Sequence, residues 1–122
     1  MTGRRLMQRL FAGGGRSMSA FPLRAVYMTM ERAVGDAPVQ VLVSVSKRHF
    51  KRAVRRNRAK RQIREAYRMN KQILAGAVEQ RPGTAVAVAF LWLADEPRDS
   101  REVAQSVESL LRRIAEKLWA QR

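Results

Sequence analysis

The sequence predicts an α+β fold, a two-layer α/β sandwich in which a small sheet of three to four strands is covered by helices. Residues 39–46 place valines on one face and mostly polar side chains on the other, as a half-buried strand does. Residues 84–94 are apolar at nearly every position, which is typical of a strand covered on both faces. Residues 53–75 and 99–119 carry apolar stripes with helical spacing. We therefore expect a single domain over residues 1–122, with the order helix, strand, strand, helix, strand, helix.

The N-terminal half contains a short helix and two strands. We expect residues 4–11 to form the helix, and we expect it to end at Gly13–Gly15 because a run of glycines is costly inside a helix. Residues 21–30 mix aromatic, β-branched and polar side chains, as a strand does, and Pro22 restricts the start of this strand to an edge or an unpaired position. A turn over residues 35–38 leads into the strand at 39–46.

The C-terminal half adds a long helix, a buried strand and a final helix. The long helix runs from about Ala53 to Ala75 and ends at Gly76, ahead of a loop over residues 81–83. After the strand at 84–94, the last helix opens with Asp99 and has Glu102 three residues later, a variant of the capping box. Its apolar stripe predicts a helix that covers the core.

Charge indicates the partner of this domain. The 122 residues include 25 lysines and arginines against 10 acids, which gives a formal net charge of +15, and this favours a polyanion as the partner. The absence of cysteine excludes disulfides, thiolate zinc sites and a cysteine nucleophile. The longest apolar stretch is about half of the ~20 residues that a membrane helix needs. We expect a soluble, cytoplasmic protein with no membrane partner.

The basic residues are concentrated in one helix. Residues 47–71 contain 12 of the 25 lysines and arginines and a single acid, Glu65. Apolar side chains recur there at helical spacing, so the segment is a folded helix and not a disordered basic tail. One face of this helix is apolar, and the opposite face is a polar stripe formed by Asn57, Lys60, Arg61, Arg64, Arg68 and Lys71.

Two observations favour nucleic-acid binding over an ordinary solvated face. A solvated face mixes charges of both signs, because like charges one turn apart destabilise a helix, and here only Glu65 is acidic. Four arginines, Arg52, Arg55, Arg56 and Arg58, occupy the start of the helix, where the helix dipole disfavours cations. Guanidinium groups suit phosphate oxygens. Because a strand precedes this helix, a DNA-reading helix-turn-helix is disfavoured, and a structured RNA backbone is the expected ligand.

The central segment, SKRHFKRAVRRNRAKRQIREAYR over residues 46–68, resembles the protein subunit of bacterial ribonuclease P. The family pattern Ala-Val-x-Arg-Asn-Arg-x-Lys-Arg-x-x-Arg-Glu is matched by Ala53, Val54, Arg56, Asn57, Arg58, Lys60, Arg61, Arg64 and Glu65. Leu10, Phe11 and Gly14 resemble the family's Val-Phe-x-x-Gly, and Met7 stands where the family has a further aromatic residue.

The resemblance implies a ribonucleoprotein that removes the 5′ leader of precursor transfer RNA, with the chemistry done by metal ions held in the catalytic RNA. It implies no cofactor bound by the protein alone, Mg²⁺ in the RNA–protein complex, and a left-handed strand-helix-strand crossover. Contacts to the catalytic RNA are expected from Arg52, Arg55, Arg56, Asn57, Arg58, Lys60, Arg61, Arg64 and Arg68. The single-stranded leader is expected to contact Phe11, Phe21, Tyr27, Ser44 and Lys47.

The remaining candidate residues indicate no catalytic or metal site in the polypeptide. Four aromatic residues lie on apolar stripes and are expected in the core: Tyr67, Phe90, Trp92 and Trp119. His49 has no carboxylate neighbour in the sequence, and the acids at 95–99 suit the start of a helix better than a metal. The protein is therefore expected to assist an RNA enzyme, and the alternative is a structural RNA-binding protein of ribosomal type.

Overall fold

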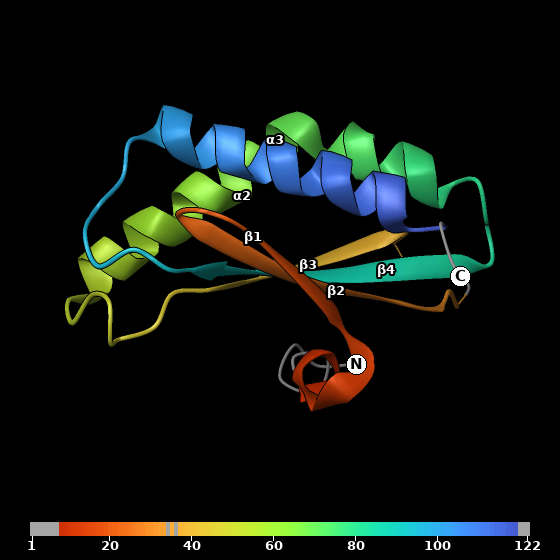
Figure 1. The fold of residues 1–122 in the computed structure, drawn as a ribbon, viewed down its shortest axis with the longest axis horizontal. Coiled ribbons are helices and arrows are strands. Elements are labelled where there is room, and N and C mark those ends of the chain that lie inside the picture. The colour runs from red at the N-terminus through yellow and green to blue at the C-terminus, as the bar shows by residue number, and fades with distance from the viewer. Residues whose placement is uncertain (1–7, 34, 36, 120–122) are drawn as a thin grey trace.

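The computed structural model describes residues 8–33, 35 and 37–119, which form a four-stranded sheet with two long helices on one face (Figure 1). The predicted α+β sandwich is confirmed. In chain order the elements are η1 (Leu10–Gly14, a π-helical turn), β1 (Arg16–Ala20), β2 (Leu23–Glu31), β3 (Val39–Ser44), α2 (Ala53–Val78), β4 (Thr84–Trp92) and α3 (Ser100–Lys117).

The sheet is organised around β4. Its strand order is β1-β2-β4-β3, with β3 parallel to β4 and the other two pairs antiparallel. β4 is therefore interior, and its residues from Ala85 to Phe90 are all buried, which confirms the strand predicted to be covered on both faces. α2 makes the crossover from β3 to β4. That this crossover is left-handed stays a prediction, which comes from the family resemblance.

One strand was missing from the predicted order. The strand expected from Phe21 begins instead at Leu23, and Phe21 and Pro22, joined by a cis peptide bond, form the turn that connects it to β1. β1 has the sequence RSMSA, in which Met18 and Ala20 alone pack against the core. A short, polar edge strand of this kind has too little apolar alternation to be recognised from sequence.

α2 and the N-terminal turn also depart from their expected ends. α2 continues through Gly76 to Val78, whose side chain is fully buried and thereby holds the last turn in the core. Of the helix expected over residues 4–11, residues 4–7 lie outside the described residues. They include Met7, which stands where the family has a further aromatic residue. The described part is helical from residue 8, and its π-helical turn, η1, extends to Gly14.

η1 lies on the sheet face opposite the helices (Figure 1). Gly15 makes this possible, because a Cβ atom at Gly15 would lie 2.7 Å from the Leu10 carbonyl oxygen and 2.7 Å from Cγ1 of Val26. The close approach seats Leu10 in a small cluster on this side of the sheet, formed by Leu10, Val26, Met28, Ala87 and Ala89. We call this side the open face, since η1 is the only helical element of the described chain that packs on it.

The main core lies between the sheet and the two helices. From α2 it receives Ala59, Ile63 and Leu74, and the largest side chain it buries completely is Phe90. α3 is also tied to β1 by polar contacts, since the Ser106 hydroxyl donates to the Ala20 carbonyl and the Arg113 guanidinium donates to the Ser19 carbonyl at 2.8 Å. The apolar arc of α2 thus faces the core, and its cations are left outside.

The two sides of α2 should respond differently to truncation at neighbouring positions. Ile63 is fully buried and Arg64 is exposed. We expect Ile63→Ala to lower the free energy of unfolding by about 2–5 kcal/mol, because it leaves a cavity in the core. Arg64→Ala should change this free energy by less than about 0.5 kcal/mol. Urea unfolding followed by circular dichroism measures both, and equal losses would contradict the orientation of α2.

Candidate nucleic-acid interface

The first turn of α2 is electropositive and uncapped. Its N-cap residue, Arg52, makes no side-chain capping hydrogen bond, and the first turn contains no acid. α3 shows the usual arrangement, because the Asp99 carboxylate accepts from the backbone N–H of Arg101 at 3.2 Å and Glu102 lies in the first turn. The start of α2 therefore combines free backbone N–H groups, the positive end of the helix dipole and several arginines, as an anion-binding surface does.

A shallow hollow of about 380 Å³ runs along the outer side of α2. Its lining contains five of the residues expected to contact the catalytic RNA, together with Glu65: Asn57, Lys60, Arg61, Arg64 and Arg68. We call these five residues the basic stripe. They come from successive turns of one helix, so the structure brings them together on one surface, as the helical spacing predicts.

Glu65 is neutralised within the basic stripe. Its carboxylate accepts two hydrogen bonds from the Arg68 guanidinium, at 2.6 and 3.1 Å. The hydrogen bond from Arg68 is the main cause that lowers the pKa of Glu65, and it raises the pKa of Arg68. Arg68 is thus committed to a neighbour on α2, whereas Arg61 and Arg64 have no such partner among the described residues.

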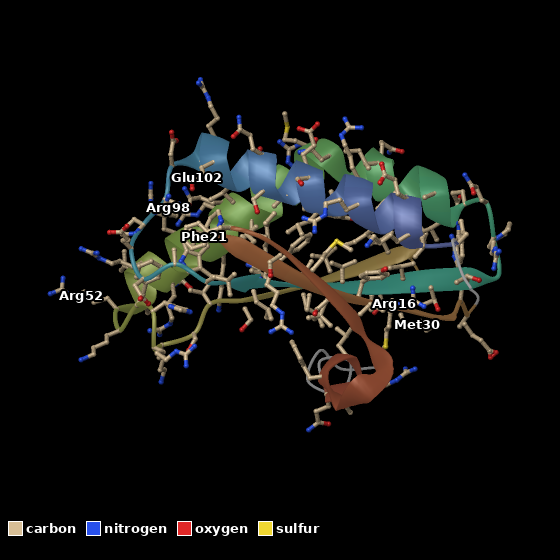
Figure 2. The ribbon with its side chains drawn as sticks, in the orientation of Figure 1. Arg16, Phe21, Met30, Arg52, Arg98 and Glu102 are labelled. Atoms are coloured by element: carbon tan, nitrogen blue, oxygen red, sulfur yellow. The ribbon has the colours of Figure 1, made fainter. Side chains whose placement is uncertain are left out.

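The four arginines at the start of α2 do not share one role. Arg52 projects from the end of the molecule (Figure 2). Arg56 turns back to the preceding loop, where its guanidinium donates to the carbonyl oxygens of Phe50 at 2.9 Å and Lys51 at 2.8 Å. Arg55 and Arg58 border a cavity of about 20 Å³ beside Trp92. Arg56 therefore holds the loop that leads into α2, a structural role that the sequence pattern did not indicate.

The residues expected to contact the leader are dispersed. Phe11 lies in η1 and is 49% exposed, whereas Phe21 lies at the far end of β1, in the β1–β2 turn, and is 59% exposed. The Arg98 guanidinium covers the Phe21 ring at 5.1 Å from its centroid, and Figure 2 shows Phe21, Arg98 and Glu102 at the same end of the molecule. Glu102 accepts from Arg98 at 2.7 and 3.0 Å.

Tyr27 does not lie with these residues, and its burial contradicts its expected role in leader binding. Its side chain is 3% exposed and lies in the main core, on the helix side of β2. Both faces of β2 are apolar, so the sequence did not reveal which face the helices cover. Ser44 alternates with Val43 of the main core and therefore lies on the open face, and Lys47 follows in an exposed loop.

Arg24 was overlooked by the sequence reasoning. It is exposed, and it lies on the same face of β2 as Val26, which places it on the open face opposite Leu91 of β4. Leu91 in turn pairs with Ser44 of β3, so Arg24, Leu91 and Ser44 form one row across the sheet. The available signal was that Arg24 is the only charged residue in the strand predicted at residues 21–30, which marks a position that faces solvent.

The other polar candidates have structural partners. His49 has no carboxylate neighbour in the sequence but has one in the fold, because its Nδ1 lies 2.7 Å from Oδ1 of Asp95, 46 residues away in sequence. Among the described residues no group of three or more histidines, cysteines and acids could hold a metal ion. The expected core positions of Phe90 and Trp92 are confirmed, and burial raises the pKa of the partly buried Tyr67. Trp119 packs beside the core and donates through Nε1 to the Ala77 carbonyl at 2.9 Å.

Comparison with protein families gives a consistent result. The family model described as Ribonuclease P matches residues 2–115 of this chain. The ribonuclease P protein component of Porphyromonas gingivalis strain W83 is 43% identical over 104 residues, which cover 84% of this chain and 74% of the relative. The protein of the same description from Chlorobaculum tepidum is 43% identical over 98 residues, covering 75% of this chain and 62% of the relative.

Solved structures share the fold. The RNase P protein from Thermotoga maritima superposes with a TM-score of 0.70 at 22% identity, covering 93% of this chain and 96% of that chain. The Staphylococcus aureus RNase P protein gives a TM-score of 0.68 at 21% identity, with 95% and 94% covered. At this level of identity the likeness establishes the arrangement of helices and strands. No helix among the described residues is long and apolar enough to cross a membrane.

The hydrogen bonds of Arg56 lead to a testable difference within the arginine cluster. We expect Arg56→Ala to lower the free energy of unfolding by about 1.5–3 kcal/mol, since two carbonyl oxygens lose a charged donor. Arg55→Ala, which removes a more exposed neighbour, is the matched control and should change this free energy by less than about 0.5 kcal/mol. Thermal unfolding of both variants measures the difference, and an unaltered stability of Arg56→Ala would contradict its role in holding the loop.

Proposed function

The chain belongs to the ribonuclease P protein family, and from this premise we propose that it binds the catalytic RNA through α2 and the leader of precursor transfer RNA through the open face. As the protein component, it is the accessory subunit of the holoenzyme that matures the 5′ end of transfer RNA, and it works together with the ribonuclease P RNA. Family membership removes the alternative of a structural protein of ribosomal type.

The separation of two surfaces carries the proposal. The basic stripe lies on the helical layer, whereas Phe11, Arg24 and Ser44 belong to the other side of the sheet or to η1. The loop from Val45 to Arg52 joins the end of β3 to the start of α2, so the two surfaces meet there. Such a protein is able to contact two RNA strands at once without either one covering the site of the other.

For the catalytic RNA we propose contacts of two kinds. The stripe residues Asn57, Lys60, Arg61 and Arg64 would contact phosphate oxygens along a structured backbone. Arg52, Arg55 and Arg58 would place further guanidinium groups around the uncapped start of α2. Arg56 and Arg68 would act less directly, because both are held by neighbouring groups of the protein.

For the leader we propose a path over the open face. Phe11 offers an exposed aromatic ring on which an unpaired base can stack, and Arg24 and Lys47 offer cations for the backbone. Phe21, in the β1–β2 turn, would add only the part of its ring that the Arg98 guanidinium leaves uncovered. Ser44 adds a hydroxyl group between them. This path combines aromatic rings with separated cations, as surfaces that bind single strands do. The basic stripe has cations but no aromatic ring.

We also propose that the catalytic RNA, and not the protein, binds the metal ions, and that the protein acts in the compartment where this RNA is found. No group of three or more histidines, cysteines and acids among the described residues is arranged to hold a metal ion, so they do not fit a protein-held metal site. Mg²⁺ would accordingly be bound by the catalytic RNA in the assembled complex. The relatives that match this chain are bacterial proteins, and bacteria make and process transfer RNA in the cytoplasm, which supports the cytoplasm as the location.

The basic stripe should produce a measurable salt dependence. We expect Arg61→Ala and Arg64→Ala to weaken binding of the catalytic RNA without unfolding the protein. Each lost phosphate contact should also reduce the slope of log K against log salt by about 0.7–0.9. Filter binding between 50 and 300 mM salt measures both quantities. If affinity and slope were unchanged in both variants, the stripe would be only a solvated helix face.

The leader path is best tested at Phe11. We expect Phe11→Ala to weaken binding of precursor transfer RNA to the assembled holoenzyme by about 1–3 kcal/mol, the usual effect of one lost stacking contact. Mature transfer RNA, which has no leader, should bind with unchanged affinity. Equilibrium binding of both RNAs to the same holoenzyme measures the effect.

Leu10 provides the matched control for Phe11. It precedes Phe11 in η1 but is 2% exposed. Leu10→Ala should therefore lower the free energy of unfolding by about 2–5 kcal/mol, whereas Phe11→Ala should not. Equal affinity losses for precursor and mature RNA in Phe11→Ala would exclude a leader contact at this position.

A further inference from the structure

A groove of about 500 Å³ lies between α2 and α3, next to the basic stripe. Figure 1 shows the two helices side by side above the sheet. The apolar part of the groove consists of Ala66 and Met69 from α2 and Ala104 from α3. Met69 is 69% exposed, so its side chain contributes little to the stability of the fold. An exposed, flexible thioether beside two alanines leaves apolar surface that the folded chain does not cover.

Polar groups stand at the ends of this apolar surface. The Ser100 hydroxyl accepts from Nε2 of Gln62 at 2.9 Å, so its own proton is free to donate elsewhere. The amide nitrogen of Asn70 donates to the Ala66 carbonyl at 2.9 Å, which leaves the side-chain oxygen of Asn70 as an acceptor. The Arg101 guanidinium has no hydrogen-bond partner among the described residues and also lines the groove. The groove thus offers donors and an acceptor around an apolar floor.

The groove is continuous with the basic stripe. Glu65 lines both, and its partner Arg68 also donates to the Met69 sulfur at 3.6 Å. Phosphate contacts along the stripe would fix the position of an RNA strand but would not read its bases. A strand held there is next to a recess that is large enough for a planar ring, has an apolar floor and has hydrogen-bonding groups at its rim.

We propose that the groove between α2 and α3 binds an unpaired nucleobase of the catalytic RNA, from a strand whose backbone lies on the basic stripe. This inference rests on the proposed binding of the catalytic RNA by α2. Proteins usually recognise RNA sequence at unpaired bases, whose faces stack on side chains and whose edges are free to form hydrogen bonds. The Met69 sulfur would contact the face of the base, as thioethers contact aromatic rings.

Charge favours RNA over a second copy of the chain as the occupant. The residues that line the hollow and the groove include the cations of the stripe and Arg101, and the one acid among them, Glu65, is already paired with Arg68. Two copies would repel each other, because each chain has a formal net charge of +15. An RNA strand would bring phosphates, and these complement the rim of the groove.

Affinity and salt dependence together test the proposal. Met69→Ala should weaken binding of the catalytic RNA about two- to tenfold. Unlike loss of an arginine in the stripe, it should leave the salt slope unchanged, because no phosphate contact is lost. Ala104→Tyr, which fills the groove, should weaken binding at least as much. The matched control, Gln105→Tyr, places the same ring on the exposed side of α3 and should bind like the unaltered protein.

Photo-crosslinking identifies the occupant directly. A benzophenone amino acid in place of Met69, in the full chain assembled with the catalytic RNA, should crosslink to a single unpaired nucleotide of that RNA. Crosslinks to precursor transfer RNA or to a second copy of the protein would overturn the proposal. So would full affinity of Met69→Ala and Ala104→Tyr without a crosslink. The proposed role of α2 is judged separately, because Arg61→Ala and Arg64→Ala report on the stripe alone.

Discussion

The burial of β4 on both faces is the constraint on which the rest of the structure depends. An interior strand whose residues are apolar on both sides needs cover above and below the sheet. α2 and α3 cover one side, and on the other side cover comes from η1, whose Leu10 belongs to the same cluster as Val26 and Ala87. Because η1 is a single turn, Met30, Leu42 and Leu91 on that face are only partly buried by the described residues. The open face is thus a direct result of unequal cover for one buried strand.

The same packing determines where the charges lie. α2 must direct Ala59, Ile63 and Leu74 inward, and therefore its polar positions point away from the sheet. Residues 72–122 contain 7 of the 10 acids, and several of these pair locally, as Glu108 does with Arg112 at 3.0 Å. Little negative charge remains near the basic stripe. Mutual repulsion among its cations is relieved when phosphates approach, so binding RNA and reducing electrostatic strain are the same event.

The elements with strong periodicity could be predicted from sequence, and those that depend on distant contacts could not. The apolar arc of α2 and the uninterrupted apolar run of β4 specify their own environments, so both were identified. β1 is polar and becomes a strand only because β2 pairs with it and α3 donates to two of its carbonyl oxygens. Sequence-local reasoning has no access to such partners.

The candidate site shows the same division. The stripe residues follow from helical geometry alone, and the structure brings them together. Tyr27 was expected to contact the leader, but its side chain lies in the main core. Ala25 and Val26 make both sides of β2 apolar, and only the position of the helices distinguishes these sides. Arg56 fits the pattern of a phosphate-binding residue, yet its guanidinium is occupied by the carbonyl oxygens of Phe50 and Lys51. Every residue has a backbone carbonyl group, so a sequence does not show which of these groups accept hydrogen bonds from side chains.

The continuity of α2 has a consequence for the RNA as well as for the protein. The helix runs unbroken for 26 residues, and the part from Asn57 to Arg68 spans about 17 Å at 1.5 Å per residue. The attachment points of these side chains cannot move relative to one another without breaking helical hydrogen bonds. Their spacing is therefore established when the protein folds, and a flexible RNA strand must adapt to it. α2 would serve as a rigid template that selects one backbone path from those the RNA can adopt.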